Sequence, residues 1–395
     1  MLQQTHPLRH LEAELADLRA RGLYCWPREL QSVQAPRAVY DGREVVNLCS
    51  NNYLALANHP KLKEAARRAV DQLGVGSGAV RTIAGNMALH RELEEELARF
   101  KHTEATLLYQ SGFAANAGTV SAILTKEDVV VSDELNHASI IDGCRLSGAT
   151  KKIYRHRDVA HARELLAASR DARVVLLITD GVFSMDGDIA PLPELCALAR
   201  EYGAIMMVDD AHASGVLGRQ GRGTVDHFGL HGQVDIQVGT LSKAFATLGG
   251  YVAGSRALIE YLMHKARPLL FSTSHPPAVA AAALAAVRVV QEEEGLIERL
   301  WENTRYFKDG LRQLGFDTGA SQTPITPVMT GDEILAMRLS DRLFEEGVFA
   351  LGIGFPTVPR GKARVRTIVT SGHTREDLDR ALDAFERVGR ELGLI

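Results

Sequence analysis

Seven short apolar runs between residues 104 and 255 alternate with segments whose apolar residues recur at helical spacing. The runs are EATLLYQS, VVVSD, KKIYRH, VVLLITD, AIMMVDD, IQVGTL and YVAGS. A typical intervening segment is LPELCALAREYG (192–203), which stops at a glycine as helices commonly do. Strands that are apolar throughout and separated by helices predict an α/β fold with a mainly parallel sheet covered on both faces.

A second pattern begins near residue 290, after the alanine-rich run AVAAAALAAV (278–287), which we expect to be a packed helix. It starts with a long charged helix over residues 291–315 and ends with a helix from Arg375. Its strands are expected near 326–331, 348–354 and 363–369. The predicted division is therefore an N-terminal helical arm over 1–45, a large domain over 46–290 and a small α+β domain over 291–395. The extended end of the arm is expected to pack with the small domain.

The composition changes this picture little. The chain has 395 residues, of which 46% are hydrophobic and 24% charged, so it can bury a large core. A net charge of -4 gives no basic field for nucleic acids or membrane surfaces, and we expect neither as a partner. The longest apolar run is too short to span a bilayer. The scattered cysteines predict neither a metal site nor a disulfide framework and fit a reducing cytoplasm; they are Cys25, Cys49, Cys144 and Cys196.

The first candidate for chemistry is Lys243, in the segment GTLSKAFATLGG (239–250). It follows a predicted strand, at the end where open α/β sheets bind ligands. Its neighbours Ser242 and Ala244 are small and would leave room for a flat ligand. Lys243 is therefore a candidate Schiff-base lysine, while a solvated surface charge fits this segment equally well.

A second candidate group ends the predicted strand AIMMVDD and is followed by His212. A carboxylate at the end of an apolar strand is costly unless it meets a cation. A protonated pyridine nitrogen would be such a partner for Asp209, and the pairing would keep that nitrogen charged. We expect Asp210 to cap the helix that follows.

Polar residues also follow other predicted strands. In LLYQSGFAANAG, Ser111, Gly112 and Phe113 begin a predicted helix whose amides could hold a phosphate, with the Phe113 side chain packed. His137 could lie flat over an aromatic ring, although a lone loop histidine is more often structural. Ser184 lies in a glycine-bounded loop of the kind that lines sites. These groups together match the requirements of pyridoxal phosphate.

Several longer runs resemble the α-oxoamine synthase family of pyridoxal-phosphate transferases: TLSKAFATLGG, NHASIIDG, TDGVFSMDGDIAPL, MVDDAHASGVLGRQGRG and FSTSHPPA. The resemblance extends from VNLCSNNYLALANHP (46–60) to ARVRTIVTSGHT (363–374), which is nearly the whole chain. It implies pyridoxal 5′-phosphate as the cofactor. It also implies a fold type I transferase that forms a homodimer, with the active site at the subunit interface.

The resemblance implies a role for each matching residue around the cofactor ring. Lys243 would form the Schiff base and later carry a proton, and Asp209 would pair with the pyridine nitrogen. His212 would bond the phenolic oxygen, His137 would stack over the ring, and Ser184 would lie beside the cofactor's oxygen.

The remaining implied roles concern the phosphate and the substrates. The phosphate would be held by Ser111, Gly112, Phe113 and Thr240, with Ser272 or Thr273 reaching the phosphate of the neighbouring subunit. The residues that would handle the substrates are Asn52, Thr357 and Arg366. Arg366 suits a bidentate bond to the amino-acid carboxylate, while a surface ion pair remains an alternative for it.

The implied reaction condenses an amino acid with an acyl-CoA and releases CoA. Runs such as NLCSNNYLALANHP and VPRGKARVRT resemble the family member that joins glycine and acetyl-CoA to 2-amino-3-oxobutyrate in threonine catabolism. Others, such as FSMDGDIAPL and FPTVP with Thr357, resemble the member of biotin biosynthesis that joins L-alanine and pimeloyl-CoA to 8-amino-7-oxononanoate and CO2. We therefore expect one site that accepts both pairs. The alternatives are an aminotransferase or aldolase on the same fold, or a non-catalytic subunit, which the presence of Lys243 disfavours.

Overall fold

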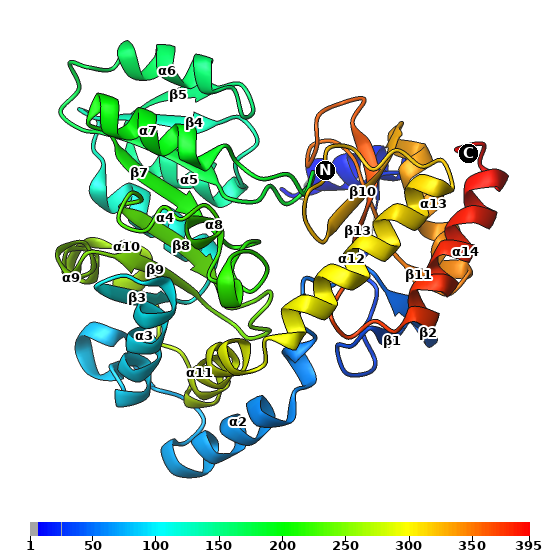
Figure 1. The fold of residues 1–395 in the computed structure, drawn as a ribbon, viewed down its shortest axis with the longest axis horizontal. Coiled ribbons are helices and arrows are strands. Elements are labelled where there is room, and N and C mark those ends of the chain that lie inside the picture. Colours follow the sequence, from blue (N-terminus) through cyan, green and yellow to red (C-terminus); the bar gives the residue numbers. More distant parts are fainter. Residues whose placement is uncertain (1–6, 25) are drawn as a thin grey trace, which may run out of the picture.

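The computed structural model describes residues 7–24 and 26–395, which form two lobes (Figure 1). The expectations for residues 1–6 and for Cys25 lie outside the described part. The long helix α12 (Gly295–Gln313) leads from the larger lobe into the smaller one. No helix of the described part combines the length and the apolar character needed to cross a membrane.

The larger lobe is built on a seven-stranded sheet. Its strands, in spatial order, are β3 (Ala105–Tyr109), β9 (Gly250–Gly254), β8 (Ile236–Thr240), β7 (Ile205–Asp209), β6 (Val175–Asp180), β4 (Val129–Asp133) and β5 (Thr150–Tyr154). Strand β9 is antiparallel to both of its neighbours, and the pairs from β8 to β5 are parallel. All seven strands predicted from the apolar runs are present, and the mainly parallel sheet is confirmed.

Both faces of this sheet are buried because adjacent residues of each strand point to opposite sides. Val130 belongs to one apolar cluster, together with residues of α4 (Gly112–Ile123), α5 (Ala138–Ser147) and α9 (Arg256–Lys265). Val131 belongs to another, together with residues of α6 (Val159–Ala167) and α7 (Leu192–Tyr202). The alanine-rich run forms α11 (Pro277–Glu292), which packs against α2 (Pro60–Leu73) and α3 (Ala88–Lys101).

The smaller lobe contains two three-stranded sheets. In the first, β13 (Ala363–Ile368) lies between β10 (Ile325–Gly331) and β12 (Leu351–Ile353), and both pairs are antiparallel. In the second, β2 (Arg43–Asn47) lies between β1 (Arg37–Tyr40) and β11 (Val348–Phe349). The N-terminal segment therefore adds strands to the C-terminal lobe. The other helices of this part are α1 (Arg9–Ala20), α13 (Glu333–Glu345) and α14 (Arg375–Glu391).

The topology brings the carboxyl ends of the parallel strands to one edge of the large sheet. Strands β4, β6, β7 and β8 end there at Asp133, Asp180, Asp209 and Thr240. Strand β3 leads there into Ser111, the residue before α4. Polar residues from five strands that are distant in sequence therefore meet at this edge.

Candidate active site

A cavity of about 190 Å³ lies at this edge of the sheet. Its lining residues are Ser111, Gly112, Phe113, Asn116, His137, Ser139, Asp180, Ser184, Asp209, Ala211, His212, Thr240, Ser242 and Lys243. The structure thus brings together nine of the residues that the sequence singled out for the cofactor. Ser272 and Thr273 are the two that do not line it.

Lys243 enters the cavity from the loop after β8. Within the described residues its ammonium group makes no hydrogen bond or ion pair. Burial lowers the pKa of Lys243, against the opposing effect of the Asp209 and Asp180 carboxylates. A lysine with a lowered pKa has a larger neutral fraction, and the neutral amine is the form that attacks a carbonyl.

Asp209 forms the opposite kind of site, a buried anion. Its Oδ2 accepts a hydrogen bond from Asn116 Nδ2, and its Oδ1 accepts one from the backbone N–H of Ala211 at 2.8 Å. The carboxylate is only 4% exposed, and it has no ion pair with any described residue. A buried carboxylate without a cation is costly, so this position favours a ligand that presents a positively charged N–H.

His212 is held in one orientation by Tyr53. The Tyr53 hydroxyl lies 2.8 Å from His212 Nδ1, and both side chains are buried. Burial lowers the pKa of His212 well below its usual value, and the nearby charges of Lys243 and Arg366 act in the same direction. If the hydroxyl donates to Nδ1 of the neutral ring, the proton lies on Nε2, which can then donate to an oxygen in the cavity.

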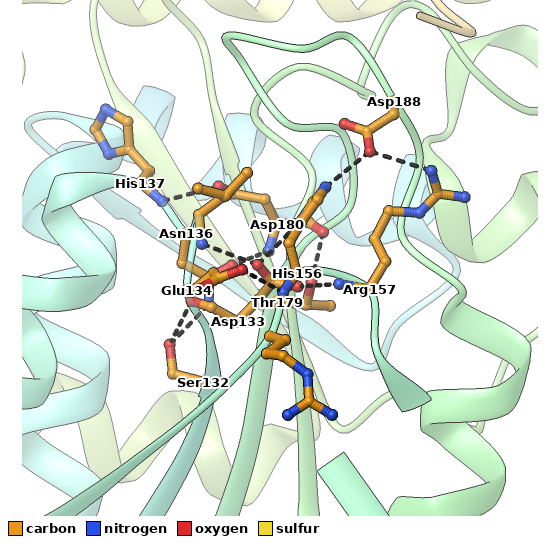
Figure 2. A network of polar contacts seen from close by, with 12 residues as sticks. Ser132, Asp133, Glu134, Asn136, His137, His156, Arg157, Thr179, Asp180 and Asp188 are labelled. Carbon is orange, nitrogen blue, oxygen red and sulfur yellow. Dashed lines mark hydrogen bonds and ion pairs between the residues drawn. The ribbon is translucent and has the colours of Figure 1, made fainter. Parts of the chain in front are cut away.

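His137 is positioned through Asp180, as Figure 2 shows. The His137 backbone N–H donates to Asp180 Oδ2 at 2.8 Å, and the imidazole Nδ1 lies 2.7 Å from Ser139 Oγ. Burial lowers the pKa of His137 and raises the pKa of Asp180 well above its usual value, with the Asp209 carboxylate adding to the second effect. A largely uncharged imidazole is therefore fixed at the cavity wall, where it can lie against a flat ring.

The start of α4 supplies an anion site. Ser111 caps the helix by accepting a hydrogen bond from Ala114 N at 3.0 Å, and the amides of Gly112 and Phe113 lie in the first turn, where no intrahelical acceptor exists. A side chain at Gly112 would bring its Cβ to 3.3 Å from Thr240 Cβ, so glycine permits this close approach. Phe113, whose side chain was expected to pack, is 48% exposed in this chain.

Pyridoxal phosphate is the cofactor that this set of groups fits. The cavity offers an amine without a partner, a buried carboxylate without a cation, an imidazole donor and free amides at a helix start. These are the groups needed for the aldehyde, the pyridine nitrogen, the phenolic oxygen and the phosphate. Ser242 completes the phosphate end, since its Oγ lies 2.7 Å from Thr240 Oγ1.

A second cavity, of about 550 Å³, lies between the two lobes and shares His137 and Ser184 with the first. Its apolar lining residues include Leu135, Ile141, Phe183, Met185, Phe355 and Val358. Thr357 lines it as well, beside Phe355. A mainly apolar groove therefore leads to the cofactor cavity, and it contains one of the three residues predicted to handle substrates.

Arg366 reaches the same region from β13. One of its terminal nitrogens donates to the Ser184 carbonyl oxygen at 3.1 Å, and its charge contributes to the lowered pKa of both His212 and Lys243. Within the described residues Arg366 has no carboxylate partner, so the alternative of a surface ion pair is wrong for this chain. The rest of its guanidinium group can bind an anion.

Four predicted site residues line neither cavity: Arg366, Asn52, Ser272 and Thr273. Asn52 is buried, and its Oδ1 accepts a hydrogen bond from the Ala57 amide at 3.3 Å. Its neighbour Asn51 has a buried Oδ1 without a hydrogen-bond partner among the described residues. Ser272 and Thr273 follow the exposed Phe271, and their carbonyl oxygens accept hydrogen bonds from Gln110 Nε2.

The expectation for Asp210 is also wrong. No helix starts directly after it, and turns follow instead. Its carboxylate accepts hydrogen bonds from Lys101 Nζ at 2.9 Å and from the backbone N–H of Thr224 at 3.1 Å. Both charged side chains are fully buried. Asp210 therefore anchors the end of β7 instead of capping a helix of its own.

Several site residues escaped the sequence prediction: Tyr53, Asn116, Ser139, Asp180 and Ser242. Asn116 lies one helical turn after Gly112, so it shares the face that points at the cavity, and this spacing could have indicated it. Ser242 adjoins Lys243. For Tyr53 no local signal exists, because its partner His212 is 159 residues away.

Comparison with known proteins agrees with this geometry. Residues 43–385 match the family model described as aminotransferase class I and II. The chain is 63% identical over 386 residues to an 8-amino-7-oxononanoate synthase of Symbiobacterium thermophilum, with 98% of each chain covered. It is 58% identical over 395 residues to the protein of that name from Thermoanaerobacter pseudethanolicus, with 100% of each chain covered.

Solved structures show the same fold. A serine palmitoyltransferase of S. paucimobilis with a bound PLP–myriocin aldimine superposes with a TM-score of 0.94 at 32% identity, over 99% of this chain and 100% of that one. An 8-amino-7-oxononanoate synthase of Francisella tularensis gives a TM-score of 0.76 at 28% identity, over 89% of this chain and 99% of that one. The fold is therefore that of the fold type I pyridoxal-phosphate transferases.

Proposed function

Because the chain belongs to the class I and II aminotransferase family, and within it to the α-oxoamine synthases, we propose that it joins L-alanine to pimeloyl-CoA. The products are 8-amino-7-oxononanoate, CoA and CO2. The relatives at 63% and 58% identity carry the name of this activity. The structural observation that supports it is the apolar groove of about 550 Å³ that opens beside His137 and Ser184.

Bound pyridoxal phosphate supplies an electron sink for negative charge at the α-carbon of the amino acid. We assign to Lys243 Nζ the amine that would hold the cofactor's aldehyde group and that would accept the α-proton of the amino acid. Asp209 would keep the pyridine nitrogen protonated, and His212 would donate from Nε2 to the phenolic oxygen. His137 covers the ring. Within the described residues Lys243 has no hydrogen bond or ion pair, and the Asp209 carboxylate has no cation.

The amino-acid carboxylate is assigned to Arg366. Its bond to the Ser184 carbonyl oxygen orients the guanidinium group, and the remaining N–H groups suit a bidentate bond to a carboxylate. Asn52 is the second partner that we assign: its Oδ1 accepts a hydrogen bond from the Ala57 amide, and its Nδ2, which has no hydrogen bond within the described residues, can donate to a carboxylate.

The acyl chain is assigned to the apolar groove. A methylene chain buries apolar surface against Phe355, Val358 and Met185, and each buried methylene contributes about 0.8 kcal/mol. An acetyl group would leave most of the groove empty. Glycine with acetyl-CoA, which the resemblance in sequence favours as a second substrate pair, should therefore react more slowly than alanine with pimeloyl-CoA.

The test measures CoA thiol released by the purified, cofactor-loaded protein, with glycine, alanine and serine crossed against acetyl-, pimeloyl-, succinyl- and palmitoyl-CoA. We expect the fastest release with alanine and pimeloyl-CoA. Lys243→Ala should lower this release at least 10³-fold, because the covalent link and the proton carrier are both lost. Amino transfer to a keto acid without CoA release would instead establish an aminotransferase.

A groove variant separates the acyl site from the rest of the reaction. Thr357→Trp places a bulky ring in the groove, so it should raise KM for pimeloyl-CoA about tenfold and leave KM for acetyl-CoA little changed. Equal effects on the two thioesters would assign Thr357 to CoA itself and not to the acyl chain.

A further inference from the structure

His156 lies at the centre of the polar network behind the cofactor cavity (Figure 2). It follows β5, and its two ring nitrogens contact two different carboxylates. Nδ1 lies 3.0 Å from Asp133 Oδ1, at the end of β4, and Nε2 lies 2.8 Å from Asp188 Oδ2, in the loop after β6. Both carboxylate side chains are almost fully buried, at 1% and 4% exposure. The ring meets Phe183 edge-on, with the centroids 4.4 Å apart.

Since a carboxylate only accepts hydrogen bonds, His156 can make both contacts only when both ring nitrogens carry a proton. Burial disfavours this charge, but the two carboxylates outweigh it and raise the pKa of His156 to about 9. Arg157 adds a bond to Asp188 Oδ2 at 3.1 Å, and Glu134 accepts from the His156 amide. The titratable and charged groups of the surrounding elements are Asp133, Glu134, Tyr154, Arg157, Asp180 and Asp188.

Asp188 lies near the end of a loop, residues 182–189, which contacts His156, the two cavities and the small lobe. The loop is pinned at its base by the bridge between Val182 and Ile189 and by the bond from Phe183 N to the Asp188 carbonyl oxygen at 3.1 Å. Its residue Ser184 lines both cavities.

The small lobe holds the same loop from the other side. Arg366 donates to the Ser184 carbonyl oxygen, and Arg364 donates to the Met185 carbonyl oxygen at 2.9 Å. The Gly187 carbonyl oxygen accepts a hydrogen bond from Thr323 Oγ1 at 2.8 Å. The position of this loop therefore decides where Ser184 and Arg366 lie relative to the cofactor cavity.

We propose that His156 is a positioning residue: by tying Asp133 to Asp188, it fixes the 182–189 loop so that Ser184 faces the cofactor and Arg366 faces the amino-acid carboxylate. This inference rests on the proposed function for the role of Arg366. His156 itself lines neither cavity and acts only through the loop. Loss of the second ring proton breaks one of its two bonds and loosens the link between the loop and Asp133.

The first test compares kcat/KM for the amino acid between the wild-type enzyme and His156→Gln from pH 7 to pH 10. The ratio of the two cancels the titration of the substrate amine and of Lys243. At pH 7 we expect kcat/KM of the wild type to exceed that of His156→Gln about tenfold, mainly through a lower KM. Above pH 9 this ratio should fall toward one, because the wild-type ring loses its proton. A ratio that stays constant with pH, or equals one throughout, would overturn the proposal.

The matched control is His161→Gln, a histidine on α6 whose Nδ1 accepts a hydrogen bond from the Arg155 amide at 3.1 Å. The ratio of kcat/KM between the wild type and His161→Gln should stay near one at every pH. Should His156→Gln not fold, Asp188→Asn replaces it, because this isosteric change weakens the hydrogen bond between His156 and the loop and leaves the bond to Asp133 in place. It should give the same selective rise in KM at pH 7.

A further measurement needs neither a variant nor turnover. Hydrogen exchange of the wild-type holoenzyme should show that protection of the Phe183 and Gly187 amides falls as the pH rises through about 9, while amides of β7 keep theirs. Unchanged protection of the loop contradicts the proposal. If the wild type releases no CoA with any substrate pair, the proposed function fails, and the exchange data still decide the role of His156.

Discussion

At the scale of single residues, the chemistry of His212 depends on one hydroxyl group. When the Tyr53 hydroxyl donates to Nδ1 across their contact of 2.8 Å, the neutral buried ring carries its proton on Nε2. The donor for the cofactor oxygen is then Nε2. Tyr53 thus acts on the reaction without touching the cofactor.

This leads to the first prediction, for Tyr53→Phe. The change removes the hydroxyl and leaves Nδ1 buried without a partner, so the free energy of unfolding should fall by about 1–3 kcal/mol. The freed ring also populates the other tautomer, and kcat should fall about tenfold. Urea unfolding and CoA release measure the two effects. Tyr306→Phe, at a partly buried ring on α12 whose hydroxyl donates to Asp379, is the control, and an unchanged kcat in Tyr53→Phe would rule out this role.

At the scale of elements, the end of β7 carries two aspartates with opposite tasks. Asp209 faces the cavity, whereas Asp210 points to the other side and meets Lys101 at the last position of α3. The alternation of side chains along an extended backbone explains this division. Burial opposes the charge on Lys101, but Asp210 outweighs it, and the pKa of Lys101 is raised.

The second prediction concerns this buried pair. Lys101→Met leaves the Asp210 carboxylate buried without its cation, so the free energy of unfolding should fall by about 3–5 kcal/mol. Asp210→Asn should cost a similar amount. In the double variant the two losses should not add, because either change alone already removes the interaction. Additive losses in a urea double-mutant cycle would show that the two groups are not coupled.

The helical and strand pattern was predictable where it depends on local periodicity. The run LPELCALAREYG became α7 (Leu192–Tyr202), with Gly203 in the left-handed conformation after it. The strand in VFALGIG was predicted as one element, but it is divided into β11 and β12, which belong to different sheets. Such a division depends on partners elsewhere in the chain, and periodicity carries no information about them.

At the scale of the whole molecule, the polar network gives stability a pH dependence. The pKa of His156 is about 9 in the folded protein and about 6.5 in an unfolded chain. This raised pKa stabilises the fold fully below about pH 6.5, and the contribution is lost as the pH rises through 9. Lys308 acts in the opposite sense. Its pKa is lowered to about 8 by burial, so its protonation destabilises the fold below that pH, and this cost disappears as the pH rises through 10.

The third prediction follows from the sign of the His156 effect. The wild type should exceed His156→Gln in free energy of unfolding by about 3 kcal/mol at pH 6, and this difference should vanish near pH 10. Taking the difference removes the contribution of Lys308, which both proteins share. Urea unfolding at both pH values measures the difference in free energy of unfolding. A difference that does not depend on pH would refute the charge assigned to His156.

The fourth prediction concerns the homodimer, which we propose from the resemblance and from exposed apolar side chains. Phe271 is 71% and Ile83 84% exposed, and they lie on contacting segments, α10 (Arg267–Leu270) with its C-cap and the turn Arg81–Gly85. Phe271→Glu should convert a dimer to a monomer and abolish CoA release, because Ser272 or Thr273, which we expect to reach the second site, would then be withdrawn from it. Light scattering gives the mass. A dimer that persists places the interface elsewhere.

The sequence was sufficient for the strands of the large sheet and for the residues at their carboxyl ends. Lys243, Asp209, Thr240 and Ser111 each follow an apolar run, and parallel strands bring such ends to one edge whatever the details of packing. The long runs that resemble the α-oxoamine synthase family indicated pyridoxal phosphate as the cofactor. These features depend on neighbours along the chain, which the sequence displays directly.

Only the tertiary structure decided the contacts between distant segments. The Tyr53 hydroxyl meets His212 across 159 residues, Lys101 meets Asp210 across 109, and Arg366 meets Ser184 across 182. Each depends on how helices and lobes pack on the sheet, and packing is set by the shapes of many side chains at once. The groove beside Thr357 arises in the same way, because its walls come from both lobes.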